Sequence, residues 1–209
     1  MSGFKVQRAE PDDFEVLALV LAQAFGPLPQ TLAMIPEQDD RDRILRPWFA
    51  LTLRDVHEQY GHVWCTDDFG SVAVWVRAGR RGGMLPGEPE TDHYAELEKI
   101  AGKYARVLAD FETAQQAYHA DETPHEHLAL IGTMSDLRGT GHASALLDAC
   151  LAELDADDYP ASLDAATESL RKFYGRWGFI PYGDPVKPFD PPHGIPRMYP
   201  AWRPARSAR

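Results

Sequence analysis

Residues 128–154 read LALIGTMSDLRGTGHASALLDACLAEL, and the order of residue types in this stretch decides the fold. An apolar run typical of a buried strand is followed by a polar turn, by Arg138 and by two close glycines, Gly139 and Gly141. A helical apolar period begins directly afterwards. Glycines between a strand and a helix let backbone N–H groups approach a ligand closely, and the positive end of the helix favours an anion. Because the Arg138 guanidinium adds a charge with fork geometry, the stretch predicts a cradle for a phosphate or pyrophosphate.

Three alternatives compete with this interpretation of the glycine stretch. A nucleotide-triphosphate loop requires a Lys at the close of the glycine run, and GTGHAS has none, which excludes it. A dinucleotide fingerprint would place an acid about 20 residues on, where Asp164 stands, but it needs a third glycine at Ser144. The TMSDL segment also separates the strand from the glycines, and little chain remains after Asp164. The last alternative is a plain glycine turn that caps a helix.

The composition is that of one globular domain, with 209 residues of which 44% are hydrophobic. We expect the domain to span residues 1–203, followed by a disordered tail over 204–209. No run of about 18 apolar residues occurs and the N-terminus lacks an apolar signal region, so we expect a cytoplasmic protein with no membrane partner. A formal charge of −11 argues against a nucleic-acid partner. Cys65 and Cys150 are expected to be buried, reduced thiols.

Hydrophobic periods and turn residues place the remaining elements. A loop is expected over residues 79–89, and the second helix is expected to begin or to be interrupted near Pro47. The order of elements predicts a mixed α/β layer sandwich. Strands are expected at 4–9, 62–67, 71–78, 127–133, 161–166, 179–185 and 195–202, and helices at 11–26, 40–60, 90–120, 141–155 and 168–178.

The spacing Arg138-x-x-Gly141-x-Ala143 matches the pyrophosphate loop of the GNAT superfamily of acyl-CoA-dependent N-acetyltransferases. Two further segments, the hairpin GHVWCTDDFGSVAVWV and the closing ASLDAATESLRKFYGRWGF, resemble the same family in the same order. Within the family, the sequence resembles the puromycin N-acetyltransferases and similar actinobacterial enzymes. The resemblance implies a mixed, mostly antiparallel central sheet flanked by helices, with a splayed strand pair at the cofactor.

The resemblance implies acetyl-CoA as co-substrate and assigns residues to it. The pantetheine arm would pair with the strand edge at Ile131, Gly132 and Thr133. Two positions depart from the family pattern, since Leu170 stands where many relatives have Asn, and Thr133-Met134-Ser135 replaces the usual Val-x-Pro. The pyrophosphate cradle maps onto Arg138, Gly139, Thr140, Gly141, His142, Ala143 and Ser144.

The resemblance also implies that Tyr174 is the general acid that protonates the departing thiolate. The alternative is that Tyr174 belongs to an apolar helical stripe with Leu170, Phe173 and Trp177. The incoming amine must be neutral to attack, so another group takes its proton. Candidates are Glu126, His127 and Asp164, and bulk water would serve equally well.

The expected function is transfer of an acetyl group to a small-molecule amine by direct attack, and the resemblance suggests an antibiotic-like aminonucleoside or amino-acid amine. The alternative is a degenerate acyl-CoA-binding sensor or interaction module on the same fold. No metal is expected, although His125-x-His127 would share a strand face. We expect a monomer or homodimer, with the acceptor between the first two helices, residues 79–120 and the C-terminal strands. Aromatic candidates for the acceptor wall are Trp48, Phe49, Tyr94, Tyr104 and Trp202.

Overall fold

A computed structural model describes residues 4–59, 61–79, 92–118, 123–182 and 190–209. The strands in these ranges form one sheet in the order β1-β2-β3-β4-β5-β7-β6. Neighbouring strands are antiparallel except β4 and β5, which run parallel. The sheet therefore has the mostly antiparallel character expected from the sequence. Its strands are β1 (Val6–Arg8), β2 (Gly61–Thr66), β3 (Ser71–Ala78), β4 (His125–Thr133), β5 (Ala161–Ala165), β6 (Ile180–Pro181) and β7 (Tyr199–Arg203).

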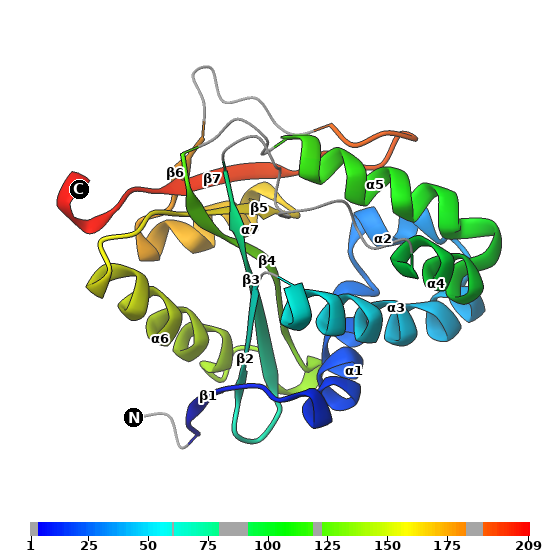
Figure 1. Ribbon diagram of the computed structural model, residues 1–209, viewed down its shortest axis with the longest axis horizontal. Helices are drawn as coiled ribbons and strands as arrows, with labels where there is room; N and C mark the ends of the chain where they lie inside the picture. Colours follow the sequence, from blue (N-terminus) through cyan, green and yellow to red (C-terminus); the bar gives the residue numbers. More distant parts are fainter. Residues whose placement is uncertain (1–3, 60, 80–91, 119–122, 183–189) are drawn as a thin grey trace.

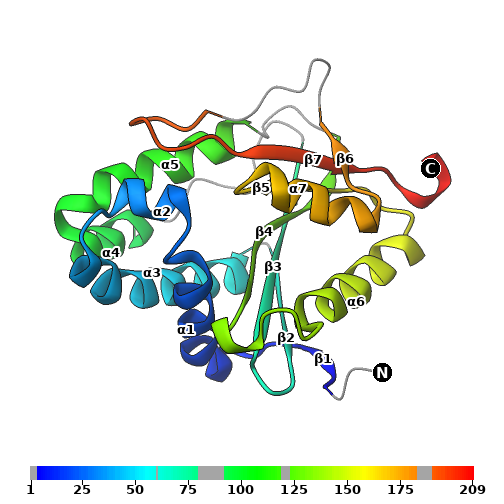
Figure 2. The same ribbon diagram turned by 180° about the vertical axis from the view of Figure 1, so that it is seen from behind.

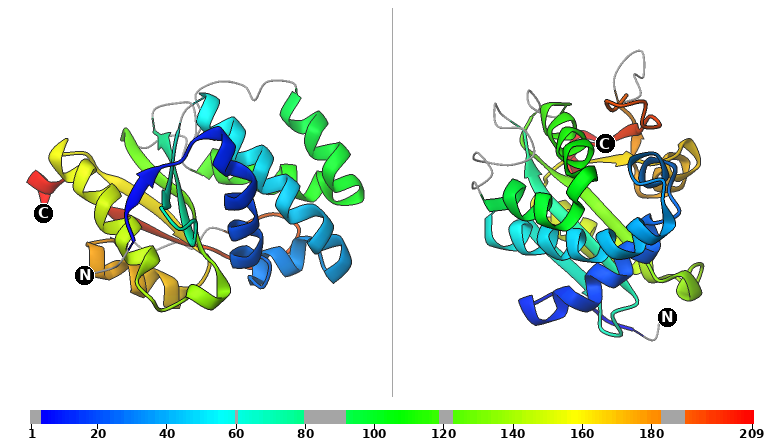
Figure 3. Two further views of the ribbon diagram at one scale, coloured as in Figure 1. Left: turned by 90° about the horizontal axis from the view of Figure 1, so that it is seen from below. Right: turned by 90° about the vertical axis from the view of Figure 1, so that its right-hand side faces the viewer.

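Helices cover both faces of the sheet (Figures 1 and 2). One group, α1 to α5, packs on one face, and α6 with α7 packs on the other, so that a separate apolar core forms on each side. Figure 3, seen from below, shows the sheet between these two layers. The helices are α1 (Phe14–Phe25), α2 (Pro29–Met34), α3 (Gln38–Gln59), α4 (Asp92–Ala101), α5 (Ala105–Tyr118), α6 (His142–Ala156) and α7 (Glu168–Tyr174).

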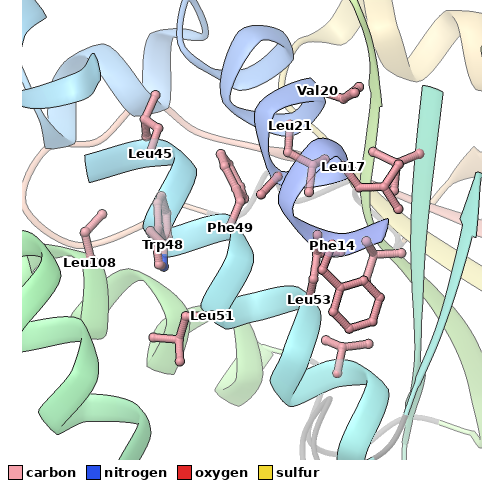
Figure 4. Close-up of a cluster of buried hydrophobic side chains, with 14 of the residues drawn as sticks. Phe14, Leu17, Val20, Leu21, Leu45, Trp48, Phe49, Leu51, Leu53 and Leu108 are labelled. Carbon is pink, nitrogen blue, oxygen red and sulfur yellow. The ribbon is translucent and has the colours of Figure 1, made fainter. Parts of the chain in front are cut away.

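The larger core lies between α1, α3 and the sheet, as Figure 4 shows. Leu17 and Leu21 of α1 are fully buried, on the apolar face that the helical period of residues 11–26 predicts. From α3, Phe49 and Leu53 project toward α1. Each such side chain contributes about 1.5–3 kcal/mol by leaving water, which fixes α1 and α3 against the sheet.

Helix α3 runs without a break through Pro47. From the sequence, we expected this helix to begin or to be interrupted near the proline. A proline inside a helix removes one hydrogen bond and crowds the preceding turn. Here Leu45 lies before the proline and Trp48 and Phe49 lie after it, and all three are buried in the same core. Tertiary packing of both halves therefore outweighs the local cost at Pro47.

The helix expected over residues 90–120 is two helices, α4 and α5, separated at Gly102. Gly102 has φ +53, a left-handed conformation that glycine adopts without steric cost and that ends a helix. The apolar period continues across the break, with Leu97 and Leu108 both buried, which explains why the sequence suggested a single helix. The break lets α4 and α5 pack on α3 side by side.

Several expectations fall partly or wholly outside the described residues. The loop over 79–89 lies almost entirely there, as do the ends of the helix at 90–120 and the last residues of the strand at 179–185. The tail expected over residues 204–209 lies within the described residues, and its Ser207 contacts Asp158, just after the end of α6. The backbone N–H and the hydroxyl of Ser207 both donate to the Asp158 carboxylate at 2.7 Å.

Candidate active site

The centre of the sheet opens where β4 and β5 separate. The two parallel strands pair only over Glu126–Leu128 and Ala161–Leu163, and beyond this point they diverge. Ala129 is an extra residue in β4, because Val74 of β3 pairs with Leu130 and Trp75 pairs with Leu128. The edge of β4 after the bulge consequently faces a cavity of about 530 Å³ instead of a neighbouring strand.

The glycine loop lies at one end of this cavity. Gly139 and Gly141 have φ +80 and +99, and a Cβ added to either would meet nothing within 4 Å, so the loop surface is open. Helix α6 begins directly after Gly141 with no side-chain cap from the described residues. Its first-turn N–H groups are therefore available to an anion, as the sequence predicts. Arg138 and Ala143 line the cavity together with Ile131, Gly132 and Thr133.

A chain of hydrogen bonds joins the glycine loop to the turn between β2 and β3. Nε2 of the buried His142 donates to Asp68 Oδ2 at 2.9 Å, and its Nδ1 lies 2.6 Å from Thr140 Oγ1. The Thr140 hydroxyl donates to the Leu137 carbonyl at 2.6 Å. Burial alone would raise the pKa of Asp68, but hydrogen bonds from His142, Thr66 and the Gly70 N–H lower it to about 2. Asp68 therefore stays ionised and anchors the loop.

Tyr174 reaches the cavity from α7, on the opposite side of the divergence from α1. The helix begins at Thr167, whose hydroxyl oxygen accepts the Leu170 N–H at 3.2 Å. Tyr174 is 7% exposed, and burial raises the pKa of its hydroxyl. The phenol therefore keeps its proton at neutral and moderately alkaline pH, as a proton donor must. Leu170 and Phe173 of the same apolar stripe also line the cavity.

Two of the three candidate bases lie in the cavity with Tyr174. His127 and Asp164 both line it, and His127 Nδ1 lies 2.7 Å from Ser162 Oγ. Glu126 does not, because successive residues of β4 point to opposite faces of the sheet. Glu126 instead lines a second cavity, of about 390 Å³, with Arg77 and Trp75. The structure thus separates Glu126 from the other proposed catalytic residues.

Glu126 has few partners in its own cavity. Its Oε1 lies 3.8 Å from Arg77 Nε, and its buried Oε2 has no hydrogen-bond partner among the described residues. Desolvation by burial raises its pKa to about 7, against smaller opposing effects of Arg77 and Arg8. Glu126 is therefore a destabilised carboxylate above neutral pH.

The rest of the large cavity is bounded by α1 to α5. Trp48, Phe49 and Tyr94 line it as expected, but the other two aromatic candidates do not. The Tyr104 hydroxyl donates to Asp40 Oδ2 at 2.9 Å, and Trp202 packs on the His125 ring at 4.9 Å. The side chains of Tyr104 and Trp202 therefore make their contacts elsewhere in the fold.

Several polar residues of the cavity were not anticipated from the sequence. Four of them, each with an amide, imidazole or carboxylate group, come from four different helices, and they lie in the cavity lining alongside Thr31, Thr52 and Gln115. The signal of these four is weak, because each has the pattern of an ordinary polar helix position. Only the packing of α2 to α5 brings them to the same space. The four residues are Gln30, Asp55, His93 and Glu112.

Among the described residues, no group of three or more His, Cys, Asp or Glu side chains could hold a metal ion. None of the helices described is a candidate to traverse a lipid bilayer. Cys65 and Cys150 are free and buried, as expected.

Comparisons with known proteins agree with this geometry. Residues 94–188 match the model of the GNAT acetyltransferase domain. A solved protein of Corynebacterium glutamicum, described as histone acetyltransferase HPA2 and related acetyltransferase, is 26% identical, with a TM-score of 0.72 over 98% of this chain and 97% of that chain. The chain therefore has the fold of the GNAT acetyltransferases.

Two more distant structures share the fold. The PaiA N-acetyltransferase of Thermoplasma acidophilum, solved with coenzyme A, is 9% identical, with a TM-score of 0.55 over 97% of this chain and 99% of that chain. Arylalkylamine N-acetyltransferase 2 of Aedes aegypti is 16% identical, with a TM-score of 0.53 and the same coverage of 97% and 99%. The named acceptors of these relatives differ, so the fold alone does not identify the acceptor of this chain.

Proposed function

We propose that this protein is an acetyl-CoA-dependent N-acetyltransferase that moves the acetyl group to the amine of a small molecule by direct attack. One observation carries the proposal: a single cavity brings together the open edge of β4, the glycine loop before α6 and Tyr174 of α7. A cytoplasmic location, a monomeric or homodimeric state and an acceptor other than nucleic acid belong to the same proposal. The net charge of −11 supports the last of these.

The residues present fit acetyl-CoA. The edge of β4 at Ile131–Thr133 offers backbone groups to an amide-containing arm, as a missing strand would. The open glycine surface and the uncapped start of α6 suit a diphosphate, and Arg138 adds a cation beside them. The cavity continues from this point to α3 and α5, which leaves room for a second substrate.

Tyr174 and one base, either Asp164 or His127, divide the proton transfers between them in this proposal. Attack of a neutral amine on the thioester forms the C–N bond, breaks the C–S bond and releases a thiolate, which takes the Tyr174 proton. Asp164 or His127, through water, takes the proton that the amine loses. Glu126 has no part in this scheme, because it lies on the other face of the sheet.

The experiment is to mix purified protein with acetyl-CoA and a panel of amines, following thiol release and the mass of the products. We expect one thiol for each acetylated amine. If acetyl-CoA raises the melting temperature but no amine, including aminonucleosides and amino-acid amines, is acetylated, the sensor alternative holds instead. If acetyl-CoA does not bind at all, both ideas fail.

A further inference from the structure

Three helices contribute one charged cluster to the wall of the cavity. His93 of α4 lies between two carboxylates, donating from Nδ1 to Asp55 Oδ2 of α3 at 2.6 Å and from Nε2 to Glu112 Oε2 of α5 at 3.0 Å. Trp48 Nε1 donates to Glu112 Oε1 at 2.9 Å. The three charged side chains are only 15–19% exposed, and all three line the cavity. Asp55, His93 and Glu112 together form the acidic cluster.

The acidic cluster carries an excess of negative charge. Burial alone would lower the pKa of His93, but hydrogen bonds to Asp55 and Glu112 raise it to about 9, so one imidazolium faces two carboxylates at neutral pH. Arg54 Nε lies 3.7 Å from Asp55 Oδ1, but the Arg54 side chain is 54% exposed and screened by water. Arg138, in the glycine loop, is the single Arg or Lys among the described residues that line the cavity.

A second polar group in the same cavity lacks a donor. Gln30 of α2 is 4% exposed, and its Nε2 donates to the Ala166 carbonyl at 2.9 Å. Its Oε1 is buried and accepts no hydrogen bond from the described part of the chain. A buried acceptor without a donor costs free energy that a ligand N–H would recover. Gln30 therefore points, independently of the acidic cluster, to a ligand that donates hydrogen bonds.

The surroundings of these polar groups are apolar. Apart from a few polar side chains such as Thr31, Thr52 and Gln115, the other residues that line the cavity are mostly aromatic, methionine and aliphatic. In such surroundings an uncompensated negative charge attracts a cation more strongly than it would in water. Each carboxylate also keeps lone pairs beyond those used by His93 and Trp48. Representative apolar lining residues are Met34, Phe111, Phe173 and Met198.

We propose that the acidic cluster binds a second cationic group of the acceptor, so that the substrates are amines with an apolar body and another basic nitrogen. The inference rests on the proposed function, because it assigns the acetylated amine to the strand divergence and the second cation to the wall formed by α3, α4 and α5. Gln30 accepts an N–H of the same molecule. The competing explanation is that the cluster only ties the three helices together.

The test is a calorimetric titration of the coenzyme A-bound protein, and of the free protein, with straight-chain monoamines and with α,ω-diamines of the same chain length. We expect some diamine of the series to bind about tenfold more tightly than its monoamine, as a charge-assisted hydrogen bond at a partly buried site allows. Glu112→Gln should abolish this preference, so that the ratio of the diamine and monoamine affinities falls to about one. Glu58→Gln, an exposed change of the same charge on α3, should keep it.

The outcomes separate this inference from the proposed function. Equal affinity for monoamines and diamines at every chain length would overturn the inference, even if monoamines are acetylated. So would a preference that survives in Glu112→Gln. Asp55→Asn serves as a second variant if Glu112→Gln does not fold. A merely structural cluster predicts lower melting temperatures in both variants with no change in the ratio of the two affinities.

Discussion

Tyr174 occupies the only position of α7 at which a side chain is both buried and able to donate a proton into the described cavity. The Tyr174→Phe variant keeps the ring and removes the hydroxyl. We expect kcat to fall about 100-fold, the lower end of what a positioned acid contributes, with an unchanged Kd for acetyl-CoA. Steady-state rates and calorimetry measure the two quantities.

Tyr199→Phe provides the matched control, because Tyr199 lies on β7 outside the residues that line the cavity. Tyr199→Phe should leave kcat and the Kd for acetyl-CoA as they are in the unmodified protein. An undiminished kcat in Tyr174→Phe would remove this hydroxyl from the mechanism and leave the apolar stripe as its explanation.

The buried carboxyl group of Glu126 makes the free energy of unfolding depend on pH. Its folded-state pKa of about 7 lies above the ordinary value of 4.5, so the protonated form favours the folded state. This favourable effect is complete below about pH 4.5 and is lost as the pH rises through about 7. Glu126→Gln, which is always neutral, should therefore raise the free energy of unfolding by about 1–3 kcal/mol at pH 8.

The same substitution should have almost no effect at pH 4.5, where Glu126 is already neutral in the folded protein. Denaturant titrations at the two pH values measure the difference. A stabilisation of equal size at both pH values would show that packing, and not the carboxylate charge, is responsible.

At the scale of elements, the turn between β2 and β3 supports the glycine loop through Asp68 and His142. Asp68→Ala removes the carboxylate that anchors the chain of hydrogen bonds to the glycine loop. It leaves every group that lines the large cavity in place. We expect the Kd for coenzyme A to rise about threefold to tenfold, because a loop that must be ordered on binding binds less tightly. Calorimetric titration with coenzyme A gives this value.

Asp67→Ala is the control on the same turn, because Asp67 Oδ1 accepts the Lys5 N–H, whereas His142 of the glycine loop donates to Asp68. Both variants lose one carboxylate, so a purely long-range charge effect would alter them equally. Equal Kd values for the two variants would therefore rule out a specific role for the chain of hydrogen bonds.

At the scale of the whole molecule, most elements could be predicted from the sequence, and so could the position of the loop that we propose holds the cofactor. The hairpin, β4, α6 and α7 have strong local hydrophobic periods bounded by glycine, proline or threonine. Tertiary contacts do not override local signals of this kind here. The Arg138 to Ala143 spacing is also local, since a loop and the helix after it are continuous in the chain.

The features that could not be predicted from the sequence depend on contacts between residues that are distant in the chain. Pro47 is tolerated because Leu45, Trp48 and Phe49, on both sides of it, are buried in one core, and no period within α3 records that packing. Asp55, His93 and Glu112 share one cavity only because Gly102 divides α4 from α5 and returns the chain to α3. The sequence also could not predict on which face of the sheet Glu126 lies, because that face depends on the register of β4 with β3 and β5.

The three residue pairs that join β4 to β5 make a narrow seam between longer ladders, with eight pairs between β3 and β4 and five between β5 and β7. Beyond this seam, the segment from β5 to β7 is linked to α6 by side chains, because Arg203 donates to Asp155 and Trp177 Nε1 donates to Asp148. Such a segment forms its own cooperative unit, which opens below the global unfolding free energy. Its amide hydrogens should consequently exchange with solvent as a group, earlier than those of β2 and β3, and slow together once a ligand bridges the seam.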